Sequence, residues 1–170
     1  MSAAAKTRPT DLAATFEDDR YSWTRRRSVR RAGVVGEAVL VGALALAALA
    51  AGHGLLGSGV FAVVWVVGLL LFIPLHSVVN LGVRGLHDRR EATLDEVQRT
   101  QRDRSTAATH WPRLLLSLLA VLVAVQTATS TDGAGGASGG TAAFSVGFVL
   151  WFASWLTSTW HLAWTLPEED

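Results

Sequence analysis

Long apolar runs without charged side chains constrain this chain most. Residues 60–81 and 142–166 hold no charge, and residues 32–51 hold only Glu37. A helix of about 20 residues is roughly 30 Å long, which matches the hydrocarbon core of a bilayer. The sequence therefore predicts an all-α membrane protein with four transmembrane helices in a bundle, within a membrane domain at 32–166. The expected spans are 32–51, 60–81, 114–128 and 142–166.

The third expected span, residues 114–128, is short at 15 residues. It can cross a bilayer only if Trp111 and Arg113 lie in the headgroup layer, where an aromatic ring or a long basic side chain is stable.

Composition supports a membrane location and excludes several other classes. Of 170 residues, 50% are hydrophobic and 17% charged, which fits neither an ordinary soluble domain nor a disordered chain. The absence of cysteine excludes disulfides and thiolate metal sites. A formal net charge of +1 argues against nucleic acid as the main partner.

The basic residues are confined to two segments. All 15 Lys and Arg lie in residues 1–31 and 84–113, and none lies in 52–59, 129–141 or 167–170. By the positive-inside rule, we expect a bacterial plasma-membrane (inner-membrane) protein with both termini and the middle loop in the cytoplasm. We expect the basic segment to be mostly disordered, the outer connection 130–141 to be a flexible linker, and residues 167–170 to form an acidic tail.

The middle loop, residues 84–113, is the largest polar feature. Thr93 and Glu96 have the spacing of a helix capping box, and Asp95–Arg99 and Arg99–Asp103 have that of ion pairs along one face. The loop is interpreted either as a solvated helical hairpin or as a docking surface for a protein partner. The candidate contact residues are Arg89, Arg90, Arg99, Arg102 and Arg104.

Around its LDEVQRTQRDR core, this loop resembles that of small uncharacterised multi-span membrane proteins common in high-GC bacteria. The resemblance covers the middle third of the chain. It implies the same multi-span architecture and carries no activity.

Ionisable residues inside spans are costly to bury and are therefore candidates for function. Glu37, His76 and His161 each lie five residues from the cytoplasmic end of a span, which places all three roughly 7–8 Å inside the boundary. We expect them to form one polar layer in the bundle. Other polar residues expected in or near this layer are Asn80, Ser154, Ser158 and Thr165.

This layer allows several chemistries. His76 and His161 can ligate a haem iron, and together with Glu37 they can hold a divalent metal. A carboxylate–histidine chain can also relay protons. The simplest alternative is that these side chains only fix helix packing through hydrogen bonds, without a cofactor.

Two further patterns concern helix arrangement. His76 and His161 are separated by half the chain length, which suggests two repeated two-helix hairpins. Ala38 and Gly42 form a small-xxx-small pair that permits close helix approach.

No catalytic motif is present, so we expect a non-enzymatic adapter, anchor or small sensor. The alternative is a haem-, metal- or proton-handling membrane subunit. Self-association stays open.

Overall fold

The computed structural model describes residues 15–16, 18–129 and 137–168, and within these ranges the chain is helical with no strand. The expected all-α fold class is thereby confirmed. Residues 1–14 and 17 of the basic segment, residues 130–136 of the outer linker and residues 169–170 of the acidic tail lie outside the described residues. The elements are η1 (Asp19–Arg25), α2 (Arg27–Gly52), α3 (Ser58–Gly82), η2 (Glu91–Thr93), α4 (Glu96–Ala108), α5 (His110–Thr129) and α6 (Ala137–Thr165).

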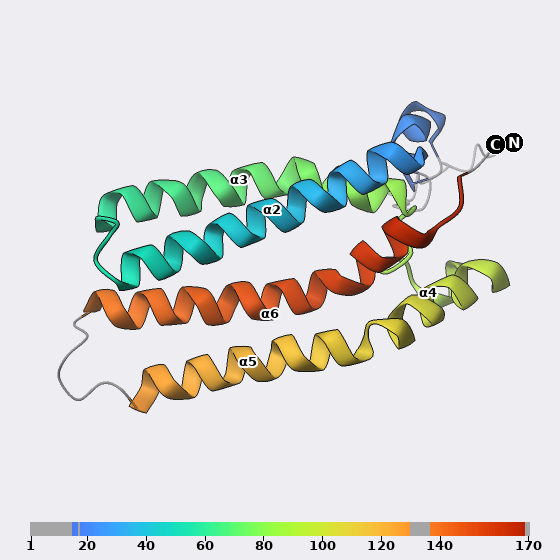
Figure 1. The fold of residues 1–170 in the computed structure, drawn as a ribbon. Coiled ribbons are helices and arrows are strands. Elements are labelled where there is room, and N and C mark those ends of the chain that lie inside the picture. The colour runs from blue at the N-terminus through green and yellow to red at the C-terminus, as the bar shows by residue number, and fades with distance from the viewer. Residues whose placement is uncertain (1–14, 17, 130–136, 169–170) are drawn as a thin grey trace, which may run out of the picture.

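The four long helices lie side by side in the order α3, α2, α6, α5 (Figure 1). The start of α2, the end of α6 and the short helix α4 lie at the same end of the molecule (Figure 1). A parallel repeat would make α2 equivalent to α5 and α3 equivalent to α6. The row consists of one hairpin followed by the other, and the predicted repeat stays a prediction.

Three helices are long and apolar enough to cross a membrane: α2, α3 and residues 140–165 of α6. The helix α5 passes the same test only together with α4, from which it is bent by 50°. By length and composition the described residues thus hold three candidate spans, or four if that bent pair counts as one. Exposed large apolar side chains cover α3 and α5, as expected for surfaces that face lipid.

The helices extend beyond the expected spans. The helix α5 begins at His110 rather than at residue 114, because Pro112 falls in its first turn, where its missing N–H costs nothing. The helix α6 begins at Ala137, so residues 137–141 of the expected linker are helical.

Glycines bring α2 and α3 together. A Cβ atom on Gly33 would lie 2.7 Å from Val79 Cγ2, and one on Gly68 would lie 2.6 Å from Leu44 Cδ2. A Cβ atom on Gly42 would meet nothing within 4 Å, so the expected close approach at Ala38 and Gly42 is wrong. The contact between the two helices uses a different face of α2.

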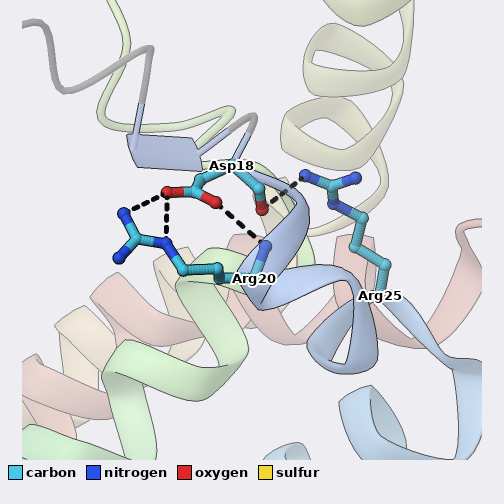
Figure 2. Close-up of polar contacts among 3 residues, drawn as sticks. All are labelled: Asp18, Arg20 and Arg25. Atoms are coloured by element: carbon cyan, nitrogen blue, oxygen red, sulfur yellow. Dashed lines mark hydrogen bonds and ion pairs between the residues drawn. The ribbon is translucent and has the colours of Figure 1, made fainter.

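The described part of the basic segment, residues 15–16 and 18–31, is mostly helical. The side chain of Asp18 caps η1 by accepting a hydrogen bond from the Arg20 backbone N–H at 2.9 Å and two from the Arg20 guanidinium (Figure 2). These bonds hold the pKa of Asp18 below its usual value. Arg25 donates to the backbone carbonyls of Phe16 and Asp18 at 3.1 and 3.5 Å. A local network of caps therefore orders this segment.

Arg30 joins the start of α2 to the end of α6. It is 2% exposed, and its guanidinium donates to the carbonyls of Ala163 at 3.2 Å, Pro167 at 3.0 Å and Arg25 at 2.7 Å, and also to that of Leu166. A helix C-terminus carries unpaired carbonyls and partial negative charge, so a buried arginine is stable there.

The capping box of the middle loop is also displaced. The cap of α4 is Asp95, whose side chain accepts from the Gln98 N–H at 2.8 Å while Gln98 Oε1 accepts from the Asp95 N–H at 3.3 Å. Arg99 donates to the backbone carbonyl of Glu91 at 3.3 Å instead of pairing with an aspartate. The loop contains the short 3-10 helix η2 and then α4, which runs into α5, rather than a helical hairpin.

Candidate functional site

A buried carboxylate joins three of the long helices. Glu37 of α2 is 0% exposed, and its Oε1 lies 3.0 Å from Nδ1 of His76 on α3. Its Oε2 accepts a hydrogen bond from the indole N–H of Trp160 on α6. Both oxygens therefore have partners, as a buried carboxylate requires.

Helix periodicity places these side chains. Glu37 follows Val34 and precedes Val41 and Leu44 on the buried stripe of α2. On α6, Trp160 follows Leu156 by one turn, and both pack against that stripe. The carboxylate thus lies within an apolar interface, where it has few polar neighbours besides His76 and Trp160.

Aromatic rings surround the imidazole. The His76 ring stacks on Phe72 with centroids 5.0 Å apart and a 17° interplanar angle, and it lies 5.7 Å from the ring of Trp155 on α6. Phe72 also meets Phe152 edge-on at 4.8 Å. The side chain of His76 remains 18% exposed and Trp155 49% exposed, so this cluster reaches the outer surface of the row.

His161 does not join Glu37 and His76. The preceding residue on α6, Trp160, faces Glu37, so His161 points about 100° away around the helix. Its Nδ1 is buried without a hydrogen-bond partner in the described part of the chain. Within that part, no group of three His, Asp or Glu side chains is placed to hold a metal ion. The structure thus assembles two of the three expected ligands.

A second polar cluster forms around Ser158 of α6. Its backbone carbonyl accepts from Ser105 Oγ at 2.7 Å, and its hydroxyl lies 3.0 Å from Thr109 Oγ1 and 3.4 Å from Arg113 Nη1. One turn earlier, Ser154 accepts from Ser117 of α5 at 3.2 Å. The serines expected in a common polar layer therefore lie on the face of α6 that meets α4 and α5.

Two other residues expected in the layer lie elsewhere. Asn80 donates to Asp88 in the following turn at 2.6 Å. Thr165 is exposed and donates to the carbonyl of His161 at 2.7 Å. Both side chains therefore form a local hydrogen bond near the end of their own helix.

The candidate partner-contact arginines divide into two groups. Arg102 pairs with Glu91 at 3.7 Å and approaches Asp103 at 4.0 Å, while Arg99 and Arg89 are half-buried. Arg90 and Arg104 are exposed. Arg104 lines an open groove on α4 together with Glu96, Val97, Thr100 and Gln101.

His87 lies near the Ser158 cluster, outside the spans. Burial lowers its pKa, the neighbouring Ser158 backbone partly offsets this, and the charges of Arg102 and Arg113 lower it further. Its Nε2 is buried without a hydrogen-bond partner in the described residues. The imidazole is therefore held in a place that disfavours its charged form.

The sequence argument missed Trp160, Ser105 and Thr109. Trp160 is not among the residues that the sequence places in the polar layer, although its indole N–H is a donor that must be satisfied when buried. Its position one residue before His161 gave no sign that it, and not the histidine, faces Glu37.

Comparison with known proteins adds no relative. No protein-family model, curated protein or solved structure matches this chain. The resemblance of residues 84–113 to bacterial multi-span proteins stays a prediction.

Proposed function

We propose that this chain is a multi-pass bacterial plasma-membrane protein, with both termini and α4 in the cytoplasm, that acts as a non-enzymatic anchor or adapter. In this proposal α4 is the element presented to a protein partner. The observation that carries it is the two-sided character of α4, which is fixed to the membrane helices on one side and exposed on the other.

The fixed side is built from hydroxyl groups. Ser105 is 1% exposed and Thr109 5% exposed, and both bond to Ser158 of α6. Buried hydrogen bonds of this kind define one orientation for the helix, because an unpaired buried group would be costly. About 80–120° around the helix from Ser105 and Thr109 lies Val97, which is 65% exposed, beside Arg104. A rigidly held helix with such a face is suited to docking.

Orientation can be tested directly because the chain has no cysteine. Single-cysteine variants Leu55→Cys, in the exposed α2–α3 connection, and Ala107→Cys, on the exposed surface of α4, serve as matched reporters. In intact cells, a membrane-impermeant maleimide should label Leu55→Cys only, and Ala107→Cys should react after permeabilisation. The reverse labelling would overturn the proposed topology.

Docking is tested by site-specific photo-crosslinking in cells. A photoreactive residue at Val97 should crosslink to one protein of defined mass, and Arg104→Glu should reduce that product. The control position is Thr106, which is also exposed but lies about 180° around α4 from Val97. Equal products from both positions, or none from Val97, would contradict the adapter role.

A second candidate is proton handling by Glu37 and His76, favoured by their 3.0 Å contact inside the apolar interface. The haem- or metal-binding form of this alternative requires His76 and His161 to bind the same iron or metal ion. An absorption spectrum and metal analysis of the purified protein test that form. A Soret band or stoichiometric metal that is lost in His76→Ala and His161→Ala would establish it.

A further inference from the structure

His76 presents one ring nitrogen away from Glu37. Its Nδ1 faces the carboxylate, whereas its Nε2 is not fully buried and makes no hydrogen bond within the described part of the chain. The ring keeps 18% of its surface exposed. Neighbouring Ile73 on α3 is 62% exposed, so the surrounding surface is one that lipid would cover.

The proton on Nε2 follows from the contacts of Glu37. Glu37 accepts from Trp160 through one oxygen and shares a proton with His76 through the other. If Nδ1 holds the shared proton, electroneutrality requires an imidazolium, whose Nε2 is protonated. If Glu37 holds it, Nδ1 is the acceptor, and the neutral ring carries its proton on Nε2. Only a buried net negative charge would leave Nε2 bare, and that is strongly disfavoured in an apolar interface.

With α3 spanning the membrane as proposed above, this N–H donor lies within the hydrocarbon. His76 lies six residues before the end of α3 at Gly82, about 9 Å along the helix. At this depth water and headgroups are scarce, and an unpaired donor costs free energy. A ligand that satisfies this donor must be an apolar molecule that carries a hydrogen-bond acceptor.

The shape of that molecule is indicated by the neighbouring rings. Phe72 lies flat against the imidazole, and the half-exposed Trp155 lies beside it at a tilt of 39°. Flat aromatic faces favour a planar ring by offset stacking. A carbonyl on a planar ring with an apolar tail is the structure of a lipid-soluble quinone.

We propose that His76 Nε2–H binds the carbonyl oxygen of a lipid-soluble quinone whose ring packs against Trp155. The proposal rests on the membrane insertion proposed above and is independent of the adapter role of α4. Glu37 is a positioning residue in it, because it orients the imidazole without touching the ligand.

The test uses the full chain in lipid nanodiscs with decylubiquinone as the probe, and it follows quenching of tryptophan fluorescence. Two variants separate the ring nitrogens. His76→Asn retains an amide near the Nδ1 position and loses the outward donor, whereas His76→Gln places an amide near the Nε2 position. Both keep all seven tryptophans, so collisional quenching is the same in each protein. Decylbenzene, which lacks carbonyls, is the ligand control.

We expect a saturable component for wild type and His76→Gln that is absent with decylbenzene. In His76→Asn the dissociation constant should rise about tenfold, as expected for loss of one hydrogen bond. Absence of a saturable component in wild type, or equal curves for wild type and both variants, would overturn the proposal. If His76→Asn does not fold, retention of the component by His76→Gln and its loss in His76→Leu decide the question. Incorporation into nanodiscs separately tests membrane insertion.

Discussion

The two polar clusters on α6 differ in chemistry although they lie within a few residues of each other. On one face, Trp160 meets the ionisable pair Glu37 and His76. On another face, Ser158 meets the hydroxyls of Ser105 and Thr109. The first cluster joins three long helices, and the second attaches the short helix α4.

The first cluster is therefore a candidate site, whereas the Ser158 cluster fixes α4 to the membrane helices. Hydroxyl groups bond to backbone carbonyls with no net charge, so they hold α4 at low electrostatic cost. A buried carboxylate is stable only while its donors remain in place. Glu37 therefore makes the α2–α3–α6 contact sensitive to single changes, whereas the Ser158 cluster should tolerate them better.

Removing the carboxylate should have the largest effect. Glu37→Leu leaves the buried N–H groups of Trp160 and His76 without acceptors, and we expect a loss of about 3 kcal/mol of unfolding free energy. Glu37→Gln keeps one acceptor oxygen and should lose less. Equilibrium unfolding in mixed micelles, followed by tryptophan fluorescence, measures both. Equal stability of wild type and Glu37→Leu would show that the pair contributes nothing to packing.

Filling the α2–α3 contact should have the next largest effect. Gly33→Ala places a methyl group 2.7 Å from Cγ2 of Val79, which is fully buried and cannot move aside, so we expect a loss of about 2 kcal/mol. Gly42→Ala is the matched control on the same helix, with open space around it. It should be neutral or slightly stabilising, because alanine favours helix. The same unfolding assay compares them, and equal effects would exclude tight packing at Gly33.

The sequence predicts the helices better than it predicts their faces. Apolar runs locate α2, α3 and α6, and equal depth correctly brings Glu37 to His76. Depth does not specify rotation about the helix axis. His161 shares that depth, but α6 turns Trp160 toward Glu37 instead, because the large indole fills the interface and supplies a donor.

Local competition between similar signals explains the other errors. Thr93 and Asp95 are both good cap residues, and only the path of the preceding turn selects Asp95. The arginines before α2 suggest a solvated segment. Arg25 and Arg30 instead donate to backbone carbonyls that are brought near by folding, one set from 133 or more residues away.

Removing one hydroxyl from the Ser158 cluster should have a smaller effect. Ser105→Ala removes the donor to the Ser158 carbonyl and should cost about 1 kcal/mol. Thr100→Ala is the control, because Thr100 bonds only to Glu96 within its own exposed helix turn. Hydrogen exchange of the α4 amides should accelerate in Ser105→Ala and remain unchanged in Thr100→Ala. Unchanged exchange in both would mean that Ser105 does not hold α4.

Acidification should have the smallest effect on stability. It acts through His87, which lies beside the Ser158 cluster. Burial places the pKa of His87 below its usual value of 6.5, so a detached loop binds more protons than a docked one. The docked state is then fully stable above pH 6.5 and loses stability as the pH falls below it. We expect amide exchange in residues 83–90 to show a few-fold more opening at pH 5.5 than at pH 7.5, after correction for intrinsic exchange rates. In His87→Gln, which cannot be protonated, this difference should disappear. An unchanged pH response in His87→Gln would assign the effect to other residues, and the Ser158 cluster would then be insensitive to pH.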